Sequence, residues 1–235
     1  MRNFFITGTD TDVGKTFVTC ALIEAFATIR IRAMPMKPIA AGISNFNGVV
    51  MNADVAALRE VSGTEVALAD INPYCFAEPI APHLAARHEN TVIRMEVIRA
   101  AFERLNAEAD LVIVEGAGGF LVPLSDSQSM TEIPVALDLD VILVVGMRLG
   151  LLNHALLTVE AIRARGLTLA GWIANTPAAG APMLAFDENL ATLTRKIAAP
   201  LLGTVPFDIE SNSTLVSANN AAKYLQIDQL IERDK

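Results

Sequence analysis

A glycine-rich segment near the beginning of the chain carries the residue types best suited to chemistry. Gly8–Thr16 reads GTDTDVGKT and lies between the short apolar run Phe4–Ile6 and the apolar stretch Phe17–Ile29. Glycines let a backbone fold around phosphate oxygens, and the N–H groups at a helix N-terminus attract anions. Lys15 is placed to reach the outer phosphates, and the hydroxyl of Thr16 to bind Mg2+. The segment predicts a loop that binds a nucleoside triphosphate.

This loop differs from the standard phosphate-binding motif in one respect. The motif has four residues between its glycines, whereas the five residues Thr9–Val13 separate Gly8 from Gly14. The alternative interpretation is a strand-to-helix turn that contains a chance Gly-Lys-Thr sequence. Carboxylates at Asp10 and Asp12 would repel a polyanion unless they face a cation. We therefore expect at least one of them to face a metal ion or an amine-bearing co-substrate.

The composition of the chain favours a single α/β domain over residues 1–235. Its length suffices for a large core, and no Pro/Ser-rich tract, charge block or internal repeat divides it. The hydrophobic fraction is 52% and the mean hydropathy is +0.42. These values are typical of strands covered on both faces and also suggest a buried subunit interface. We expect an oligomer.

Charge and hydropathy also exclude several classes of partner. The formal net charge is -8 and the basic residues are scattered, so the sequence predicts no nucleic-acid partner. Arg2 alone precedes the first short apolar run, which is not typical of a signal peptide. The apolar segment Val141–Met147 is too short to cross a membrane and ends at Arg148. We expect a cytoplasmic protein with no membrane partner.

Neither the cysteines nor the histidines form a metal-binding pattern. Cys20 and Cys75 lack ligand spacing, so both are predicted to be reduced thiols. His83, His88 and His154 include no pair at positions i and i+4. We expect no metal site built from these side chains.

Strand-like and helix-like runs alternate along the chain. This alternation predicts a P-loop NTPase-like α/β fold, in which a doubly wound, mostly parallel sheet is flanked by helices. Thr91 and Asn153 are predicted to cap helices, and Gly166 to end one. The predicted strands are Asn3–Thr7, a run ending near Lys37, Leu111–Val114, Val141–Val145, Leu169–Ala174 and Leu201–Val205; the predicted helices are Phe17–Ile29, Ala53–Val61, Thr91–Asn106, Asn153–Gly166 and one around Leu190.

Notable residues cluster where the predicted strands end. In open parallel sheets, ligands bind at the carboxyl ends of the strands, so we expect most of the chemistry at that edge. The residues at these positions are Thr7, Lys37, Glu115, Gly146, Asn175 and Pro206.

Three charged residues have both a functional and a structural interpretation. Glu115 follows four apolar residues and precedes Gly116–Gly119, as an acid that holds Mg2+ opposite a phosphate loop should; it could also be a hydrated strand end. Pro38 keeps Lys37 extended at a strand tip, where it could bind phosphate or another anion, or be a solvated lysine. Asp54 could simply offset a helix dipole.

Polar positions further along the chain also have two interpretations. Asn175-Thr176 and Pro206 would pass as loop residues, but the amide of Asn175 can both donate to and accept from an adenine edge. The segment Gly150–Asn153 starts a helix with glycine at its head. It could bind an anion through backbone N–H groups, or be an ordinary helix cap.

Taken together, these motifs and several other segments resemble the ATP-dependent dethiobiotin synthetases of biotin biosynthesis. The loop of that family also has the extra residue, which accounts for its unusual length here. The resemblance covers nearly the whole chain and rests on Gly8–Thr16, Lys37-Pro38, Asn72-Pro73-Tyr74, Glu78-Pro79, Pro82-His83, Glu115–Gly119, Asn153-His154-Ala155, Gly171–Asn175 and Ala199–Gly203.

The resemblance implies a homodimeric ligase. It would form dethiobiotin from 7,8-diaminopelargonate (7,8-diaminononanoate), CO2 and ATP, and release ADP and phosphate. An N-carbamate on one amine would be phosphorylated to a carbamic-phosphoric anhydride, which the neighbouring amine would attack to close the ring.

The resemblance also implies roles for individual residues. Lys37, Lys15 and Thr11 would be catalytic, and Thr16, Asp54 and Glu115 would hold Mg2+. The implied ATP-binding residues are Asp12, Val13, Gly14, Lys15, Thr16, Phe17, Asp54, Glu115, Gly116, Ala117, Gly118, Asn175, Thr176, Val205, Pro206 and Phe207. The implied substrate-binding residues are Thr11, Lys37, Gly116, Ala117 and Gly118, with the helix start Gly150, Leu151, Leu152 and Asn153 supplied across the dimer interface.

One departure from the family pattern affects substrate binding. Family members commonly have serine where this chain has Ala41. The sequence therefore predicts one hydrogen bond fewer to the diamine and an otherwise intact reaction.

Two rival classes of protein use related sequences. Partition and septum-positioning ATPases usually have a lysine at the beginning of the loop, whereas Thr7 precedes Gly8 here. Those that bind membranes carry a basic amphipathic tail, whereas Gln229–Lys235 is balanced in charge. Amide-forming synthases of cobalamin-type pathways are normally fused to a glutaminase domain, which this length cannot include.

Overall fold

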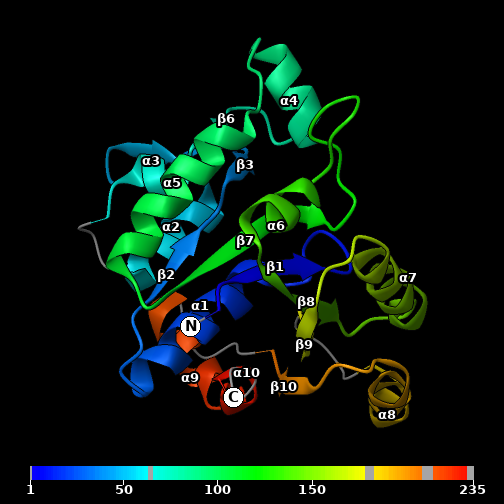
Figure 1. Ribbon diagram of the computed structural model, residues 1–235. Coiled ribbons are helices and arrows are strands. Elements are labelled where there is room, and N and C mark those ends of the chain that lie inside the picture. The colour runs from blue at the N-terminus through cyan, green and yellow to red at the C-terminus, as the bar shows by residue number, and fades with distance from the viewer. Residues whose placement is uncertain (1, 63–65, 178–182, 208–213, 232–235) are drawn as a thin grey trace.

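A six-stranded parallel sheet forms the centre of the computed structural model, which describes residues 2–62, 66–177, 183–207 and 214–231 (Figure 1). The strand order is β10-β9-β8-β1-β7-β2, and every neighbouring pair is parallel. This arrangement confirms the predicted fold class. The strands are β1 (Phe4–Gly8), β2 (Ala33–Met36), β7 (Leu111–Gly119), β8 (Asp140–Gly146), β9 (Leu169–Asn175) and β10 (Leu201–Val205).

Helices cover both faces of this sheet (Figure 1). The longer ones are α1 (Lys15–Thr28), α2 (Ala53–Ser62), α5 (Met95–Glu108), α7 (Leu151–Ala164), α8 (Phe186–Lys196) and α9 (Thr214–Ala222). The shorter ones are α3 (Leu68–Ile71), α4 (Pro82–His88), α6 (Glu132–Leu137) and α10 (Asp228–Ile231).

Successive residues of β1 pack into cores on opposite faces of the sheet, which explains why the strand is apolar throughout. Phe4 and Ile6 belong to the core under α1, where the rings of Phe4 and Phe26 stack with their centroids 6.5 Å apart. Phe5 points into the opposite core, together with residues of α5. Each face of the strand is therefore buried, and no polar face remains.

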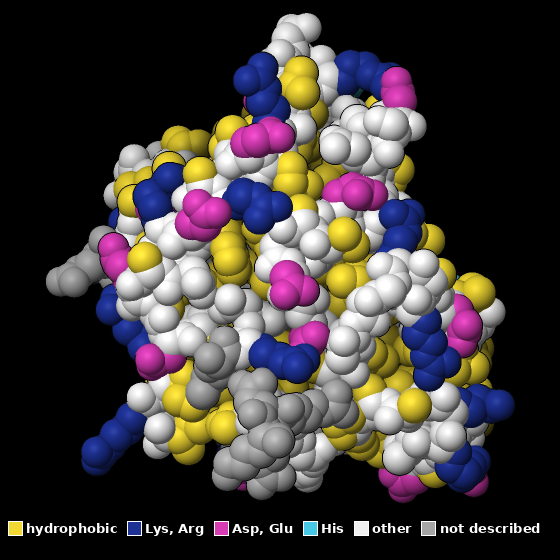
Figure 2. Space-filling model, viewed as in Figure 1, with side chains coloured by type: hydrophobic (Ala, Val, Ile, Leu, Met, Phe, Trp, Pro, Cys, Tyr) yellow, Lys and Arg dark blue, Asp and Glu magenta, His cyan; other side chains and the backbone are white. Residues whose placement is uncertain are grey.

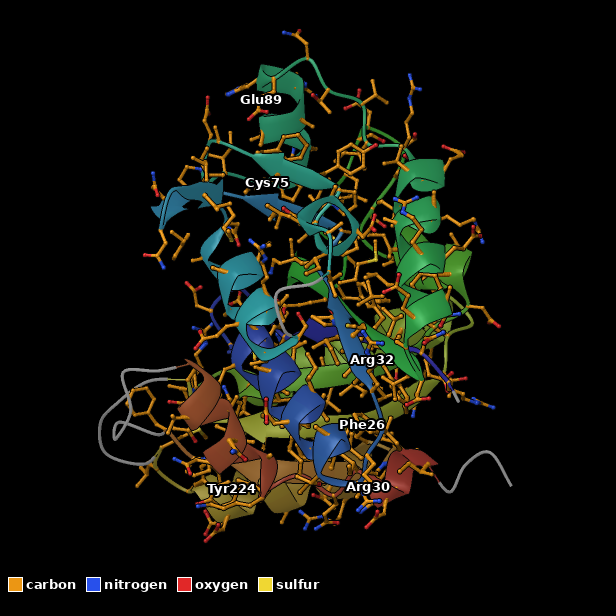
Figure 3. The ribbon with its side chains drawn as sticks, turned by 90° about the vertical axis from the view of Figure 1, so that its left-hand side faces the viewer. Phe26, Arg30, Arg32, Cys75, Glu89 and Tyr224 are labelled. Carbon is orange, nitrogen blue, oxygen red and sulfur yellow. The ribbon has the colours of Figure 1, made fainter. Side chains whose placement is uncertain are left out.

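A smaller layer stands beside the carboxyl edge of the sheet, at the top of Figure 1. It contains β3 (Ile39–Ala41) paired in parallel with β6 (Tyr74–Phe76), and the hairpin of β4 (Ser44–Phe46) and β5 (Val49–Met51). A carboxylate oxygen of Glu89, at the end of α4, accepts a hydrogen bond from the N–H of Ala77 (2.7 Å; Figure 3). This contact fixes α4 against β6. The sequence analysis did not predict this layer, because three-residue strands carry no measurable periodicity.

Two of the predicted helix caps are wrong. Helix α5 begins at Met95, and the Thr91 hydroxyl instead donates to the carbonyl of Glu89 (3.3 Å). Helix α7 begins after Gly150, whose φ of 98° only glycine adopts readily, so Asn153 lies inside the first turn. The predicted stop at Gly166 is confirmed, since α7 ends at Ala164 and Gly166 has a φ of 69°.

The end of β7 also differs from the prediction. Glu115 does not end the strand, because β7 continues to Gly119 and pairs with β1 as far as Gly8. A register shift after Ile6 accommodates this extension. Glu115 is therefore buried inside the sheet instead of lying in water at its edge.

The helices, the surface charges and the cysteines can be compared with what the composition predicted. In the part of the chain that the structure describes, no helix is both long and apolar enough to span a bilayer. Acidic and basic side chains are interspersed on the face drawn in Figure 2. Cys20 and Cys75 are both free, as predicted. Residues 232–235 of the C-terminal segment considered above lie outside the described residues.

Candidate active site

The phosphate loop is fixed by a buried hydrophobic anchor, Val13. This side chain is fully buried, and a methyl group added to either Gly8 or Gly146 would lie 2.6 or 2.8 Å from it. The side-chain amide of Asn175 donates a hydrogen bond to the carbonyl of Val13 (2.8 Å). The extra residue of the loop is thus accommodated by burial of Val13 between the ends of β1 and β8.

Gly14 begins α1 in a conformation that requires glycine. Its φ is 86°, and any Cβ would overlap the amide nitrogen of Asn175. Because Gly14 provides no side-chain cap, the first N–H groups of α1 remain available to an anion. This geometry is typical of a phosphate site.

Lys15 follows directly and crosses the loop. Its ammonium group donates to the carbonyl of Asp10 (3.0 Å). Burial lowers the pKa of Lys15, and the nearby charge of Lys37 lowers it further, although the carboxylate of Glu115 acts in the opposite direction. A phosphate group would restore favourable interactions to this buried cation.

The two aspartates of the loop have different surroundings. Asp10 forms an ion pair with Arg148, which follows β8, and its other oxygen accepts from the N–H of Thr11 (2.8 Å). The cation that Asp10 faces is thus a side chain, which the sequence analysis did not consider. Asp12 has a φ of 56° and lines the cavity described below, so its contact with a metal ion or substrate stays a prediction.

A charged cluster lies beside the loop. The ammonium group of Lys37 contacts Asp54 Oδ2 (2.7 Å) and Glu115 Oε1 (2.6 Å), and the hydroxyl of Thr16 donates to the same Glu115 oxygen (2.7 Å). Lys37 and Glu115 are buried, whereas the Asp54 side chain is 46% exposed. The cluster brings together the three residues predicted to hold metal and one of the two lysines predicted to be catalytic.

The protonation of this cluster follows from its burial and its contacts. Burial alone would lower the pKa of Lys37, but the charges of Glu115 and Asp54 and their hydrogen bonds outweigh it and raise that pKa. Burial likewise opposes ionisation of Asp54, but the charge and hydrogen bond of Lys37 and a hydrogen bond from Thr16 lower the pKa of that carboxyl. Lys37 and Asp54 therefore form a charged pair at neutral pH.

Two buried asparagines, to which the sequence analysis assigned no role, hold the charged cluster in position. The amide of Asn72 donates to the carbonyls of Lys37 (2.6 Å) and Tyr74 (3.0 Å). The amide nitrogen of Asn52 bridges the carbonyls of two residues at the end of β3, while its oxygen accepts from the N–H of Asp54 (2.9 Å). An asparagine directly before a predicted helix was a signal for Asn52 as a helix cap. For Asn72 we find no comparable local signal.

These groups line a cavity of about 660 Å³. One side is polar and contains the loop and the charged cluster. The other side is apolar and belongs largely to the smaller layer. The lining residues are Thr11, Asp12, Gly14, Lys15, Thr16, Lys37, Ala40, Ala41, Asn52, Asp54, Pro79, Ile80, Ala81, Pro82, Glu115, Ala117, Gly118 and Val122.

The other predicted site residues lie outside this lining. Asn175 ends β9 behind the loop and Thr176 follows it, and the N–H of Thr176 donates to the carbonyl of Val205 (3.0 Å). That contact places them next to the end of β10, where Pro206 and Phe207 follow. The remaining predicted site residues outside the cavity lining are Val13, Phe17, Gly116 and the helix start Gly150, Leu151, Leu152 and Asn153.

The polar side has the donors that Mg2+ prefers. Carboxylate and hydroxyl oxygens from Asp54, Glu115 and Thr16 converge there, and magnesium is usually bound by one or two carboxylates together with substrate phosphates. Among the described residues, Glu115 Oε2 is buried and has no hydrogen-bond partner. The donor set therefore fits the metal.

Known proteins resemble the chain over almost its full length. A family model described as an AAA domain matches residues 2–214. An ATP-dependent dethiobiotin synthetase of Aromatoleum aromaticum is 53% identical over 220 residues, which are 93% of this chain and 96% of the relative. The Escherichia coli K12 protein of the same description is 43% identical, with 89% and 92% of the two chains covered. The chain belongs to the dethiobiotin synthetase family.

Solved structures of more distant proteins share the fold. The MinD cell division protein of Aquifex aeolicus has a TM-score of 0.57 at 13% identity and covers 100% of this chain and 98% of its own. A ParA family ATPase of Chlorobium tepidum has a TM-score of 0.55 at 16% identity, with the same coverage. At this identity the similarity concerns the fold alone, and it confirms the P-loop NTPase architecture of the family.

Asn175 provides a test of how the loop is held. Replacement by leucine removes the hydrogen bond to Val13 at similar volume. We expect Asn175→Leu to weaken binding of tripolyphosphate, which has no base, by about fivefold to thirtyfold, since a lost buried hydrogen bond costs about 1–2 kcal/mol. Isothermal titration of tripolyphosphate and of ATP would measure this. If Asn175→Leu bound tripolyphosphate as tightly as wild type but bound ATP more weakly, Asn175 would contact the base and would not be needed to hold the loop.

Proposed function

We propose that this protein closes the ureido ring of dethiobiotin from 7,8-diaminopelargonate, CO2 and ATP, and releases ADP and phosphate. Its relatives named as ATP-dependent dethiobiotin synthetases cover nearly the whole chain. The observation that carries the proposal is the cavity, in which a phosphate loop and two buried lysines lie opposite an apolar wall. Such a cavity suits a reaction between a polyanion and a substrate with an alkyl chain.

The reaction depends on making a carbamate into a good acyl donor. A carbamate on one amine of the substrate reacts poorly until one of its oxygens takes the γ-phosphoryl group of ATP, and ADP leaves. The neighbouring amine then attacks the carbamic-phosphoric anhydride, and phosphate leaves as the ring closes. Lys15 and Lys37 would stabilise the negative charge of the phosphoryl group and the carbamate, assisted by the Thr11 hydroxyl.

The rest of the cavity would orient the two substrates. The backbone of Gly116, Ala117 and Gly118 would contact the diamine, whose alkyl chain would pack against the apolar wall around Ile80 and Val122. Thr16, Asp54 and Glu115 would hold Mg2+, which neutralises part of the charge of the β- and γ-phosphates.

Adenine would lie outside the cavity, at the ends of β9 and β10. Asn175 is buried there, and among the described residues its Oδ1 atom has no hydrogen-bond partner, so it could accept from the amino group of the base. Thr176 and the segment Val205–Phe207 would surround the ring. Because ATP is the co-substrate, we also propose a cytoplasmic site of action.

We further propose a homodimer with the active site at the subunit interface. Leu149, directly before the glycine that starts α7, is 96% exposed, and Leu157 on the same helix is 61% exposed. Exposed apolar side chains of this size favour a protein partner. The helix start Gly150–Asn153 would then bind the carboxylate of the substrate in the other subunit through its backbone N–H groups.

The central experiment measures ADP release from Mg·ATP and bicarbonate with and without diaminopelargonate, and dethiobiotin by mass spectrometry. We expect ADP release to require the diamine and to equal dethiobiotin formation. Lys37→Ala should lower the rate at least about a hundredfold, because it removes a charge beside the reacting groups. Lys223→Ala, which changes an exposed lysine directly after α9 and outside the cavity lining, is the matched control and should have no effect. ADP release independent of the diamine would instead favour an ATP-driven switch.

The departure at Ala41 is testable separately. Ala41 lines the cavity, so a serine hydroxyl there could reach the diamine. We expect Ala41→Ser to lower the KM for diaminopelargonate about twofold to tenfold at unchanged kcat, as one added hydrogen bond would. Ala27→Ser, at an exposed position of α1 outside the cavity lining, is the control. An unchanged KM in steady-state kinetics would refute a role for this position.

The shared active site can be tested by mixing two inactive variants. Lys37→Met inactivates the site in the cavity of its own subunit. Leu152→Asp places a negative charge at the helix start that would bind the substrate carboxylate in the other subunit. A hybrid dimer has one site free of both changes, so an equal mixture should regain about a quarter of the wild-type activity after subunit exchange. If native mass spectrometry confirms hybrids and no activity returns, each subunit works alone.

A further inference from the structure

Lys37 occupies the position at which the metal-binding oxygens converge. Its ammonium group contacts Asp54 Oδ2 and Glu115 Oε1 at 2.7 and 2.6 Å, and Thr16 donates to that same Glu115 oxygen. A cation of this kind satisfies buried carboxylates in the same way as a bound metal ion would. The contact is also well protected, because only 4% of the Lys37 side chain is exposed.

The backbone of Lys37 is held in place, so only its side chain can change position. Its N–H donates to the carbonyl of Ile71 (2.7 Å), and its own carbonyl accepts from the buried amide of Asn72 (2.6 Å). A lysine side chain has four rotatable bonds and can swing within the cavity while these contacts persist. The ammonium group can thus exchange partners without any rearrangement of the sheet.

The charges of the cluster explain why such an exchange would need a nucleotide. The ammonium group of Lys37 is the cation in direct contact with the two carboxylates of the charged cluster, Asp54 and Glu115, and Lys15 adds a second positive charge nearby. A dication that arrived alone would meet the Lys37 ammonium at its ligands and would be repelled. A dication that arrives with a triphosphate brings excess negative charge, which offers the ammonium group a new partner.

We propose that Lys37 is a built-in competitor of the metal ion: it pairs with Asp54 and Glu115 before the nucleotide binds and leaves them for the phosphoryl and carbamate oxygens when Mg·ATP enters. This inference rests on the proposed function for the identity of the ligand. It assigns Lys37 two successive positions and makes metal binding dependent on nucleotide. It also prevents free divalent ions from occupying the site.

The test uses Mn2+ alone, followed by electron paramagnetic resonance, with wild type, Lys37→Met and Lys15→Met. We expect Lys37→Met to bind Mn2+ about tenfold or more tightly than wild type, because removal of a unit charge in direct contact with both ligands is worth at least that factor. Lys15→Met is the matched control. It removes an equal charge from the same cavity, but the Lys15 ammonium group donates to the Asp10 carbonyl, so the gain should be clearly smaller.

Three results would overturn the proposal. Lys37→Met could bind Mn2+ no better than wild type, Lys15→Met could gain as much as Lys37→Met, or the gain could persist when Glu115→Gln is added to Lys37→Met. Lys37→Gln, which keeps a hydrogen-bond donor, gives the same comparison if the methionine variant does not fold. Thermal unfolding with and without Mn2+ provides a second readout, with a larger shift expected for Lys37→Met. Since neither assay contains ATP, bicarbonate or diamine, failure here leaves the proposed reaction untouched.

Discussion

The fully buried carboxylate of Glu115 is the constraint on which the rest of the site depends. A carboxylate inside a sheet is strongly destabilising unless a cation and hydrogen-bond donors satisfy it. Lys37, which directly follows β2, and Thr16 in α1 supply these partners to one oxygen of the carboxylate, Oε1. The sheet order β1-β7-β2 brings the three segments together, because β7, which carries Glu115, lies between the strands that precede Thr16 and Lys37. The strand order of the sheet therefore brings to Glu115 the cation and the hydrogen-bond donor that allow this carboxylate to be buried.

The side-chain amides of three buried asparagines hold the segments around the charged cluster. Asn72 holds the backbone of Lys37, Asn52 joins the cavity wall to the helix that carries Asp54, and Asn175 holds the phosphate loop. Each connects segments that are distant in the sequence or belong to different layers. An amide side chain suits this role, because it satisfies backbone groups on two sides without adding charge. These hydrogen bonds hold the backbone of the site at Lys37, Asp54 and Val13.

The sequence alone predicted most of the central sheet, and it predicted that the candidate site residues gather where the strands end. Long apolar strands between helices leave few alternatives, and the edge at which Lys37 and Asn175 lie follows from parallel pairing. What it could not predict are contacts set by packing: the direct pairing of Lys37 with Glu115, the ion pair of Asp10 with Arg148, and the layer that forms the apolar wall. The caps at Thr91 and Asn153 were wrong for a related reason, since local cap preferences lost to the positions that the core imposed on those helices.

The buried Val13 ties the length of the phosphate loop to a position far from it in the chain. Its side chain fills the space left by two missing side chains, those of Gly8 in the first strand and Gly146 in the fourth strand of the central sheet along the chain. An alanine at residue 146 would leave the loop sequence untouched and still push its anchor out of place. The position of the loop thus depends on two glycines distant in the sequence, Gly8 and Gly146, that leave room for the side chain of Val13. The loop motif itself contains Gly8 and Val13 but not Gly146.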